Sequence, residues 1–247
     1  MEDTGGSSRG PSRDRVSTVS LASLNLHGGV SGRGEPFDVR AACEQLKADI
    51  VTVQEAWRPD GQPDPLAEAA DDLGARLIHA GVRTLTSLSA LGVAGTRTPG
   101  TWGVAVLSVL PVTSYQVIDL GRAPGDRNRR VAQVLRVTMP SGAELRVVNT
   151  HLTHRFTSPI QLLRLAGWLA LDRRPTVIAG DLNMPRPATI AALGYRPVVR
   201  GRTFPAHRPV IQLDHVLVGR GVSGEAGEVL TDAGSDHLPV RVVLGLD

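Results

Sequence analysis

Short apolar runs rich in β-branched residues recur along this chain, and most end at a glycine, a proline or a polar side chain. The clearest is Thr-Val-Ile-Ala at 176–179, which Gly180 follows. Runs of this length and composition are typical of strands buried in a sheet. The same pattern predicts strands at 16–27, 49–55, 76–80, 102–110, 112–120, 130–137, 144–150, 210–218 and 240–244.

Helical spacing of apolar residues is confined to a few stretches. It predicts helices at 37–46, 66–73, 160–171 and 188–193, the last introduced by two prolines. Many strands with few helices favour two stacked sheets carrying outer helices, as one domain over 16–247. We expect the strands 102–110 and 112–120 to pair with each other around Pro111.

Three segments lack this periodicity. Residues 1–15 are polar and predict a flexible tail. Residues 81–101 predict a loop or hairpin over one face that contacts substrate, and residues 121–129 predict a polar, charged loop. These two internal segments are expected to decide substrate choice.

Composition narrows the class of protein. The chain has 247 residues, of which 41% are hydrophobic, so it can build a full core. Its only cysteine, Cys43, excludes an internal disulfide and a cysteine-built zinc site. No run has the roughly 20 apolar residues of a transmembrane helix, and the N-terminus lacks the apolar stretch of a signal peptide. We therefore expect a cytoplasmic protein.

The charge is modestly basic, with a formal net charge of +3. Lys47 is the only lysine, so arginine carries almost all of the positive charge. Arginine suits bidentate contact with phosphate, although an arginine-rich composition can also reflect genome base content.

Candidate chemistry begins directly after the strand 176–179. Asp181 and Asn183 place a carboxylate and an amide two residues apart at a strand end, where both can face one phosphate or one metal-bound water. The alternative is a turn stabilised by aspartate and asparagine side chains.

Other polar residues also stand at strand ends. Asn25 closes the first apolar strand and needs partners if buried, and Glu55 closes the second, where an unpaired carboxylate is costly. Glu55 is either a ligand of a hard cation or a surface residue. Asn149 and His151 share one strand parity, and Arg129 and Arg130 enter the preceding strand, where they either reach phosphate or remain solvated.

The C-terminal part adds two more candidates. Strict alternation places His215 in the core and Asp214 on the opposite face of its strand. Asp236 and His237 precede the last strand, and they are either a cap with a surface imidazole or a metal-linked carboxylate beside a general base.

Strand ends on one edge of a sheet converge, and clefts form there. The candidates supply oxygen ligands and imidazoles but no thiolate, which suits Mg²⁺ or Mn²⁺. Two histidines with carboxylates also provide a general base and a donor to a developing oxyanion. This inventory matches metal-assisted hydrolysis of a phosphate ester.

The ordered motifs resemble the endonuclease/exonuclease/phosphatase superfamily, which includes deoxyribonucleases, inositol polyphosphate 5-phosphatases and neutral sphingomyelinases. The resemblance implies a four-layer α/β/β/α sandwich with two stacked mixed sheets and a site at one edge. It is carried by Leu-Asn25-Leu, Val-Gln54-Glu55, Asn149-Thr-His151-Leu, Gly180-Asp181-Leu-Asn183, Leu-Asp214-His-Val-Leu and Ser235-Asp236-His237.

The resemblance also implies roles. Glu55 is the principal Mg²⁺ ligand, supported by Asn25 and Asp236. His237 is the general base, oriented by Asp214. Further roles on the phosphate or the attacking water fall to Asp181, Asn183, His151, Arg129, Arg130 and Asn149.

Three functions remain open at this point. A nuclease is favoured by the basic charge and by arginines in the loops. A phosphodiesterase or phosphatase on a lipid headgroup, inositol phosphate or other small phosphoester is the alternative, because aromatic residues for base stacking are few. A catalytically silent binding module is disfavoured, because no catalytic position is lost.

Overall fold

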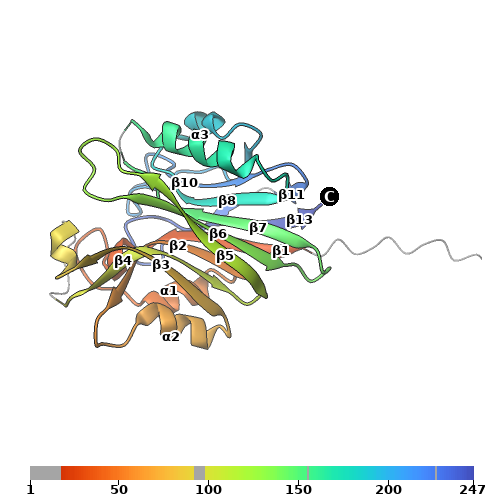
Figure 1. Cartoon of the computed structure of the whole chain (residues 1–247). Coiled ribbons are helices and arrows are strands. Elements are labelled where there is room, and N and C mark those ends of the chain that lie inside the picture. The colour runs from red at the N-terminus through yellow and green to blue at the C-terminus, as the bar shows by residue number, and fades with distance from the viewer. Residues whose placement is uncertain (1–17, 92–97, 155, 226) are drawn as a thin grey trace, which may run out of the picture.

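The computed structural model describes residues 18–91, 98–154, 156–225 and 227–247, so the expected tail 1–15 lies outside it. Two β-sheets pack face to face, and helices cover their outer faces (Figure 1). The first sheet has the order β11-β13-β1-β2-β4-β3, with β12 beside β13. Its strands are β1 Val19–Asn25, β2 Ile50–Pro59, β3 Arg76–Leu85, β4 Gly100–Ser108, β11 Val222–Gly224, β12 Glu228–Val229 and β13 Val240–Leu246.

The second sheet has the order β5-β6-β7-β8-β10-β9. Each sheet is mixed, because β1 pairs with β2 and β7 with β8 in parallel, whereas the other neighbours are antiparallel. Its strands are β5 Val112–Gly121, β6 Arg130–Thr138, β7 Glu144–Thr150, β8 Thr176–Asp181, β9 Arg196–Pro197 and β10 Asp214–Val218.

Helices form the two outer layers. α1 (Val39–Gln45) and α2 (Pro65–Asp72) cover the first sheet, and α3 (Ser158–Leu169) covers the second (Figure 1). Short 3₁₀ turns occur at η1 His27–Gly29, η2 Leu88–Leu91 and η3 Arg186–Ala191. None of the helices in the described part of the chain is long and apolar enough to cross a membrane.

The core follows from strands that are buried on both faces. In β1, Leu21 packs between the two sheets, whereas Leu24 packs under α1 and α2. In β8, Val177 faces the first sheet and Ile178 faces α3. Three apolar layers between four layers of backbone confirm the predicted α/β/β/α sandwich.

The structure corrects the strand pairing around Pro111. β4 pairs with β2 and β3 in the first sheet, whereas β5 pairs with β6 in the second. Residues 109–111 therefore carry the chain from one sheet to the other instead of closing a hairpin. Proline ends a strand by removing a backbone donor, but it does not determine where the chain goes next.

Residues 81–101 form a hairpin, one of the two predicted alternatives, because β3 continues to Leu85 and pairs with β4 as far as Gly100; 92–97 lie outside the described residues. Several element boundaries differ from prediction. β2 runs past Glu55 to Pro59, and η2 follows β3. The helix predicted at 188–193 is the 3₁₀ turn η3. The strand predicted from 210 begins only at Asp214.

Candidate active site

Strand ends from both sheets meet at one cavity of about 570 Å³. Sequence-predicted residues that line it are Glu55, His151, Asp181, Asn183, Asp236, His237 and Arg130. Asn25 and Asp214 lie directly behind this wall, where they hydrogen-bond to Asp181 and His237. The structure thus brings together residues from distant parts of the chain; Ser235 Oγ, for example, donates to Asn25 O, 210 positions away.

The backbone is unusual at three positions around the cavity. His27, Glu55 and Asn183 have φ values of 47°, 51° and 50°, a left-handed conformation that is uncommon outside glycine. At Glu55, the register of β2 against β4 shifts between Val53 and Ala56. Such a bulge re-aims a side chain, and here the carboxylate of Glu55 reaches the cavity.

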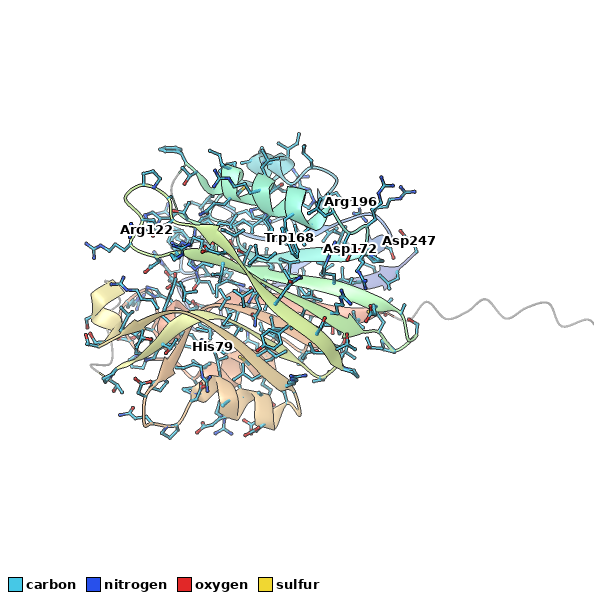
Figure 2. All side chains as sticks on the ribbon, viewed as in Figure 1. His79, Arg122, Trp168, Asp172, Arg196 and Asp247 are labelled. Carbon is cyan, nitrogen blue, oxygen red and sulfur yellow. The ribbon has the colours of Figure 1, made fainter. Side chains whose placement is uncertain are left out.

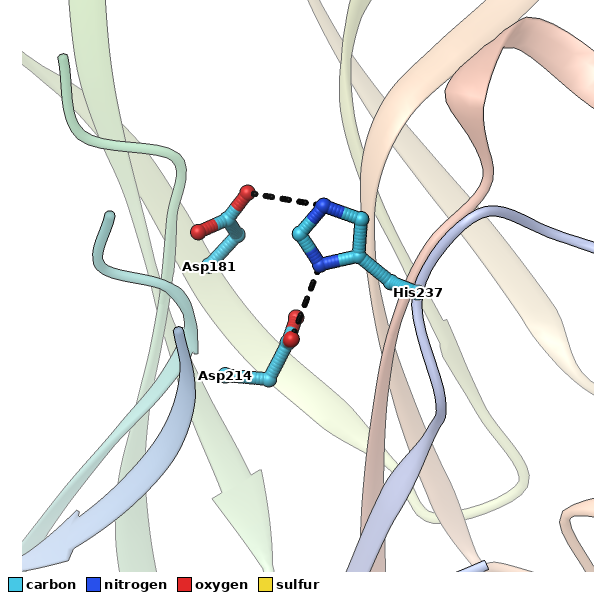
Figure 3. Close-up of side chains that lie close together, drawn as sticks. All are labelled: Asp181, Asp214 and His237. Atoms are coloured by element: carbon cyan, nitrogen blue, oxygen red, sulfur yellow. Dashed lines mark hydrogen bonds and ion pairs between the residues drawn. The ribbon is translucent and has the colours of Figure 1, made fainter. Parts of the chain in front are cut away.

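Asp214, His237 and Asp181 form a chain of contacts across the cavity wall (Figure 3). His237 Nδ1 lies 2.9 Å from Asp214 Oδ2, and His237 Nε2 lies 3.8 Å from Asp181 Oδ2. Within the described ranges, these three residues are also a group whose ligand atoms lie close enough together to hold a metal ion. Since the Asp214 bond occupies one imidazole nitrogen, the geometry suits proton transfer and charge stabilisation as well.

Asn25 joins the carboxylate of Glu55, which is partly exposed, to that of Asp181, which is buried. Its Nδ2 donates to Asp181 Oδ2 at 3.0 Å and lies 3.4 Å from Glu55 Oε1. Its Oδ1 accepts the backbone N–H of His27 at 2.9 Å, which fixes the orientation of the amide. Asn25 therefore presents its nitrogen to Glu55 in this arrangement, and it holds Glu55 beside Asp181.

His151 closes the other side of the cavity. Its Nε2 lies 3.0 Å from Asn183 Nδ2 and 3.5 Å from Asp181 Oδ2. Burial, reinforced by the charges of Arg130 and His237, lowers the pKa of His151 well below its ordinary value. A neutral imidazole that accepts the Asn183 amide proton at Nε2 fits this geometry.

Several titratable groups of the cavity have perturbed pKa values. Burial raises the pKa of Glu55, and it raises the pKa of Asp181 to about 7. For His237, burial alone would lower the pKa, but the carboxylates of Asp214 and Asp181 raise it to about 10. Buried carboxylates with raised pKa values fit a hard divalent cation, which would favour their ionised forms.

Of the two arginines predicted to contact the phosphate, Arg129 and Arg130, only Arg130 lines this cavity. Its side chain is buried, its Nε lies 3.0 Å from Asp126 Oδ2, and its carbon Cζ lies 5.9 Å from the centre of the Trp102 ring. Among the described residues, no group hydrogen-bonds to its Nη1. A buried guanidinium nitrogen without a partner is a natural contact for a phosphate oxygen.

Two predicted phosphate contacts do not reach the cavity. Arg129 is exposed and forms an ion pair with Asp119 on the outer side of the second sheet. Asn149 is fully buried between the sheets, where its Nδ2 donates to the backbone oxygens of Val53 and Ala105. Strand parity correctly predicted the side to which Asn149 points. The side chain lies deep between the two sheets, however, so it hydrogen-bonds across them and does not reach the cavity.

The alternation argument at β10 agrees with the structure. Asp214 faces His237, whereas His215 is fully buried and its Nε2 contacts the backbone oxygen of Met184 at 2.9 Å. His215 is therefore a core residue.

Sequence reasoning missed several residues that line the cavity. His27 Nδ1 lies 3.8 Å from Asp236 Oδ1, and its position two residues after Asn25 was an available signal. The others come from loops and strand middles without a motif: Trp102, Asp126, Asn128, His154 and Phe204. Arg127, one of the loop arginines that favoured nucleic acid in the sequence, also lines the cavity.

The family profile described as the Endonuclease/Exonuclease/phosphatase family matches residues 22–237. This chain belongs to that family. Comparison with curated protein sequences gave no match.

Solved structures share the fold. The chain is similar to an endonuclease/exonuclease/phosphatase from Beutenbergia cavernae, with a TM-score of 0.72 and 23% identity over 93% of this chain and 72% of that one. It is also similar to a mannosyl-6-phosphatase from Bacteroides thetaiotaomicron, with a TM-score of 0.68 and 17% identity over 92% and 99% of the two chains. The human Nocturnin catalytic domain with bound sulfate gives a TM-score of 0.70 and 16% identity over 95% of each chain.

Proposed function

We propose that this chain hydrolyses phosphate esters with the help of a divalent cation, Mg²⁺ or Mn²⁺. The observation that carries this proposal is the grouping of Glu55, Asp181 and His237 around one cavity, with the pKa of each perturbed by its surroundings. Perturbed titratable groups in a cleft are typical of catalytic sites. Membership in a family named for nucleases and phosphatases supports phosphate as the reacting group.

Glu55 and Asp236 are the residues that would hold the cation. Both offer carboxylate oxygens to the cavity, and oxygen is the ligand that Mg²⁺ prefers. When bound, the cation would neutralise charge that develops on the phosphate oxygens. Asn25 would then act by positioning Glu55 and Asp181.

We assign to Asp181 the removal of a proton from the attacking water. We assign to His237 the stabilisation of negative charge on the phosphate. This differs from the resemblance, which makes His237 the general base. A group with a pKa of about 7 can accept a proton at neutral pH, whereas an imidazole with a pKa of about 10 already carries one. His237 would then donate Nε2–H to the phosphate, and Asp214 would keep it protonated and aligned.

The remaining polar groups surround the position of the phosphate. Arg130 offers its unpartnered Nη1, and we assign it to phosphate binding. The Nδ2 group of Asn183 donates to Leu152 O and to His151 Nε2, which leaves its carbonyl oxygen as an acceptor. We therefore assign Asn183 to the attacking water, whose O–H can donate to that oxygen. His151, neutral in this environment, would contact the leaving oxygen or the phosphate.

For the substrate, we propose nucleic acid, supported by the arginines around the cavity. A small phosphoester is the second candidate, because a cavity of about 570 Å³ has the size of a small-molecule site. Supercoiled plasmid, single-stranded oligonucleotide, inositol phosphates and hexose phosphates, each tested with Mg²⁺, Mn²⁺ and chelator, separate the two. Nicking by wild type that is lost in Asp181→Asn supports the nuclease, and hydrolysis of the small esters alone supports the second candidate.

A further inference from the structure

A second cavity, of about 530 Å³, opens beside the catalytic one. The two cavities share the wall formed by Gly125, Asp126 and Arg127. Three arginines surround the second cavity: Arg83, Arg122 and Arg127. Among the described residues, Asp126 is the only acidic one that lines it.

Asp126 does not cancel this positive charge. Its Oδ2 is bound by Arg130 Nε at 3.0 Å, in the direction of the catalytic cavity. Throughout the described ranges, none of the three surrounding arginines forms an ion pair. The second cavity therefore carries uncompensated positive charge directly beside the proposed reaction centre.

The wall between the two cavities is built by specific contacts. Asp126 Oδ1 accepts the backbone N–H of Asn128 at 3.0 Å, and Arg83 Nη1 donates to Asn128 Oδ1 at 3.2 Å. The second contact joins β3 of the first sheet to the β5–β6 loop of the second. Figure 2 shows Arg122 on that loop, at the edge of the molecule.

A register shift also contributes on the β3 side. The pairing of β3 with β4 slips between Gly81 and Arg83, so that Arg83 stands opposite Trp102, which lines the catalytic cavity. A bulge of this kind redirects a side chain at a sheet end. Both arginine-bearing elements thus turn toward the same space.

We propose that this arginine cavity is a subsite for a second phosphate of the substrate, one ester unit away from the phosphate that is hydrolysed. Arginine forms charge-assisted, bidentate bonds with phosphate, which are the strong class of hydrogen bonds in proteins. A nucleic-acid strand or a small bisphosphate would fill both cavities at once, whereas a single-phosphate ester would fill only one. This inference rests on the proposed function and specifies its substrate class.

The test compares matched substrates with one and two phosphates. The dinucleotide dTpdT carries one phosphate and pdTpdT carries two, and hexyl phosphate and hexane-1,6-diol bisphosphate form the corresponding small pair. We expect wild type to prefer the second member of at least one pair in kcat/KM, and Arg83→Ala/Arg122→Ala to reduce that preference about 10-fold or more. A preference within the dinucleotide pair indicates that the substrate is a nucleic-acid strand. A preference within the hexyl pair alone indicates that it is a small bisphosphate.

Arg220→Ala is the matched control. Arg220 is an exposed arginine beyond the far end of β10 from the site, and it should leave the preference as in wild type. Equal kcat/KM for both members of each pair, or an equal preference in the double variant, would overturn the subsite. Hydrolysis of bis-p-nitrophenyl phosphate tests the phosphoesterase itself, so the two failures are distinguishable.

Binding gives a second readout that does not need turnover. Anisotropy of a labelled hexathymidylate is measured against NaCl concentration for wild type, Arg83→Ala/Arg122→Ala and Arg220→Ala. Removing an arginine that neutralises a phosphate should weaken binding and reduce the slope of log K against log salt by about 0.7 for each phosphate left without its arginine. Equal slopes and affinities in all three proteins would contradict a strand in the subsite, and competition by hexane-1,6-diol bisphosphate then decides for or against the small ligand.

Discussion

His237 and Asp214 meet across the two sheets, with His237 Nδ1 2.9 Å from Asp214 Oδ2. Asp214 is the first residue of β10 in the second sheet, and His237 precedes β13 in the first. Both side chains are buried, and the ring of Phe204 lies 4.7 Å from the imidazole, centre to centre. The charge state of the imidazole therefore depends on how the two sheets pack.

The pH dependence of activity distinguishes the two assignments of His237. With Asp181 as base, activity rises as Asp181 loses its proton and falls at higher pH as His237 loses its proton; in the chain without a cation, the pKa values of the two groups are about 7 and about 10. A bound cation would lower both pKa values, so the prediction concerns the direction of change in a variant. Asp214→Asn removes a charge that raises the pKa of His237, and we expect the alkaline limb to move to lower pH.

A profile of kcat/KM between pH 5 and 11 checks this, because it reports the ionisations of the free enzyme. Asp214 also raises the pKa of Asp181, so the acid limb moves to lower pH in Asp214→Asn under either assignment, and the alkaline limb is the discriminating one. An alkaline limb that stays in place in Asp214→Asn would contradict the roles that we assign to Asp181 and His237.

Asn149 is expected to act on stability. Asn149→Ala leaves the backbone oxygens of Val53 and Ala105 without this donor and removes the acceptor of the Gln54 amide. An unsatisfied buried polar group costs about 1–3 kcal/mol, so we expect a loss of about 3 kcal/mol in the free energy of unfolding. Urea denaturation measures it, with Gln116→Ala, at an exposed amide of β5, as the control. A loss below about 0.5 kcal/mol would show that the two sheets do not rely on the Asn149 amide.

Gly180 is expected to tolerate no side chain. Its φ is +144°, and an added Cβ would overlap the carbonyl oxygen of Thr150 and lie 3.2 Å from Gln54 Nε2. Gly180→Ala should therefore destabilise the protein by more than 3 kcal/mol, or about as much as a large core defect. Gly142→Ala is the control, because Gly142 also has positive φ but nothing lies near its Cβ, so its cost should stay at about 1–2 kcal/mol. Similar thermal midpoints for the two variants would contradict the steric argument.

His79 predicts a pH dependence of stability that is independent of the active site. Burial, together with the charge of Arg58, lowers its pKa to about 4 in the folded chain. Between about pH 6.5 and pH 4 the unfolded state binds this proton and the folded state does not, so the free energy of unfolding falls as the pH falls. Wild type should therefore lose free energy of unfolding between pH 7 and pH 5, and we expect this loss to be smaller by about 1–2 kcal/mol in His79→Gln.

Urea unfolding at pH 7 and pH 5 measures this difference. His207→Gln, at an exposed histidine, should lose as much stability as wild type over the same interval. An equal loss in His79→Gln would show that His79 already titrates normally in the folded chain.

The sequence was sufficient for the sandwich because its strands are short, apolar on both faces and separated by turn residues. Leu21 and Leu24 lie on opposite faces of β1, and two covered faces require two further layers. The crossing at Pro111 was not accessible in this way, since a hairpin and a crossover leave the same local pattern. Only the pairing of β5 with β6 separates them.

The site was predictable where a polar residue follows an apolar run, as at Asn25, Glu55 and Asp181, although Glu55 lies at a bulge inside β2 and does not end the strand. It was not predictable where depth decides the role. Asn149 and His151 share a parity, but one lies between the sheets and the other reaches the cavity. The arginine subsite was hidden for a related reason, because Arg83 and Arg122 come from different sheets and meet only in the folded chain.

The most direct test of the central claim is hydrolysis of bis-p-nitrophenyl phosphate by wild type, Glu55→Gln, His237→Ala and the control His207→Ala, each with Mg²⁺, Mn²⁺ or chelator. We expect metal-dependent turnover by wild type and His207→Ala, and a loss of at least ~10²-fold in the other two variants. Calorimetric titration with Mn²⁺ should show weaker binding in Glu55→Gln than in His237→Ala. Turnover that persists in chelator, or that survives in both site variants, would contradict a metal-dependent phosphoesterase at this cavity.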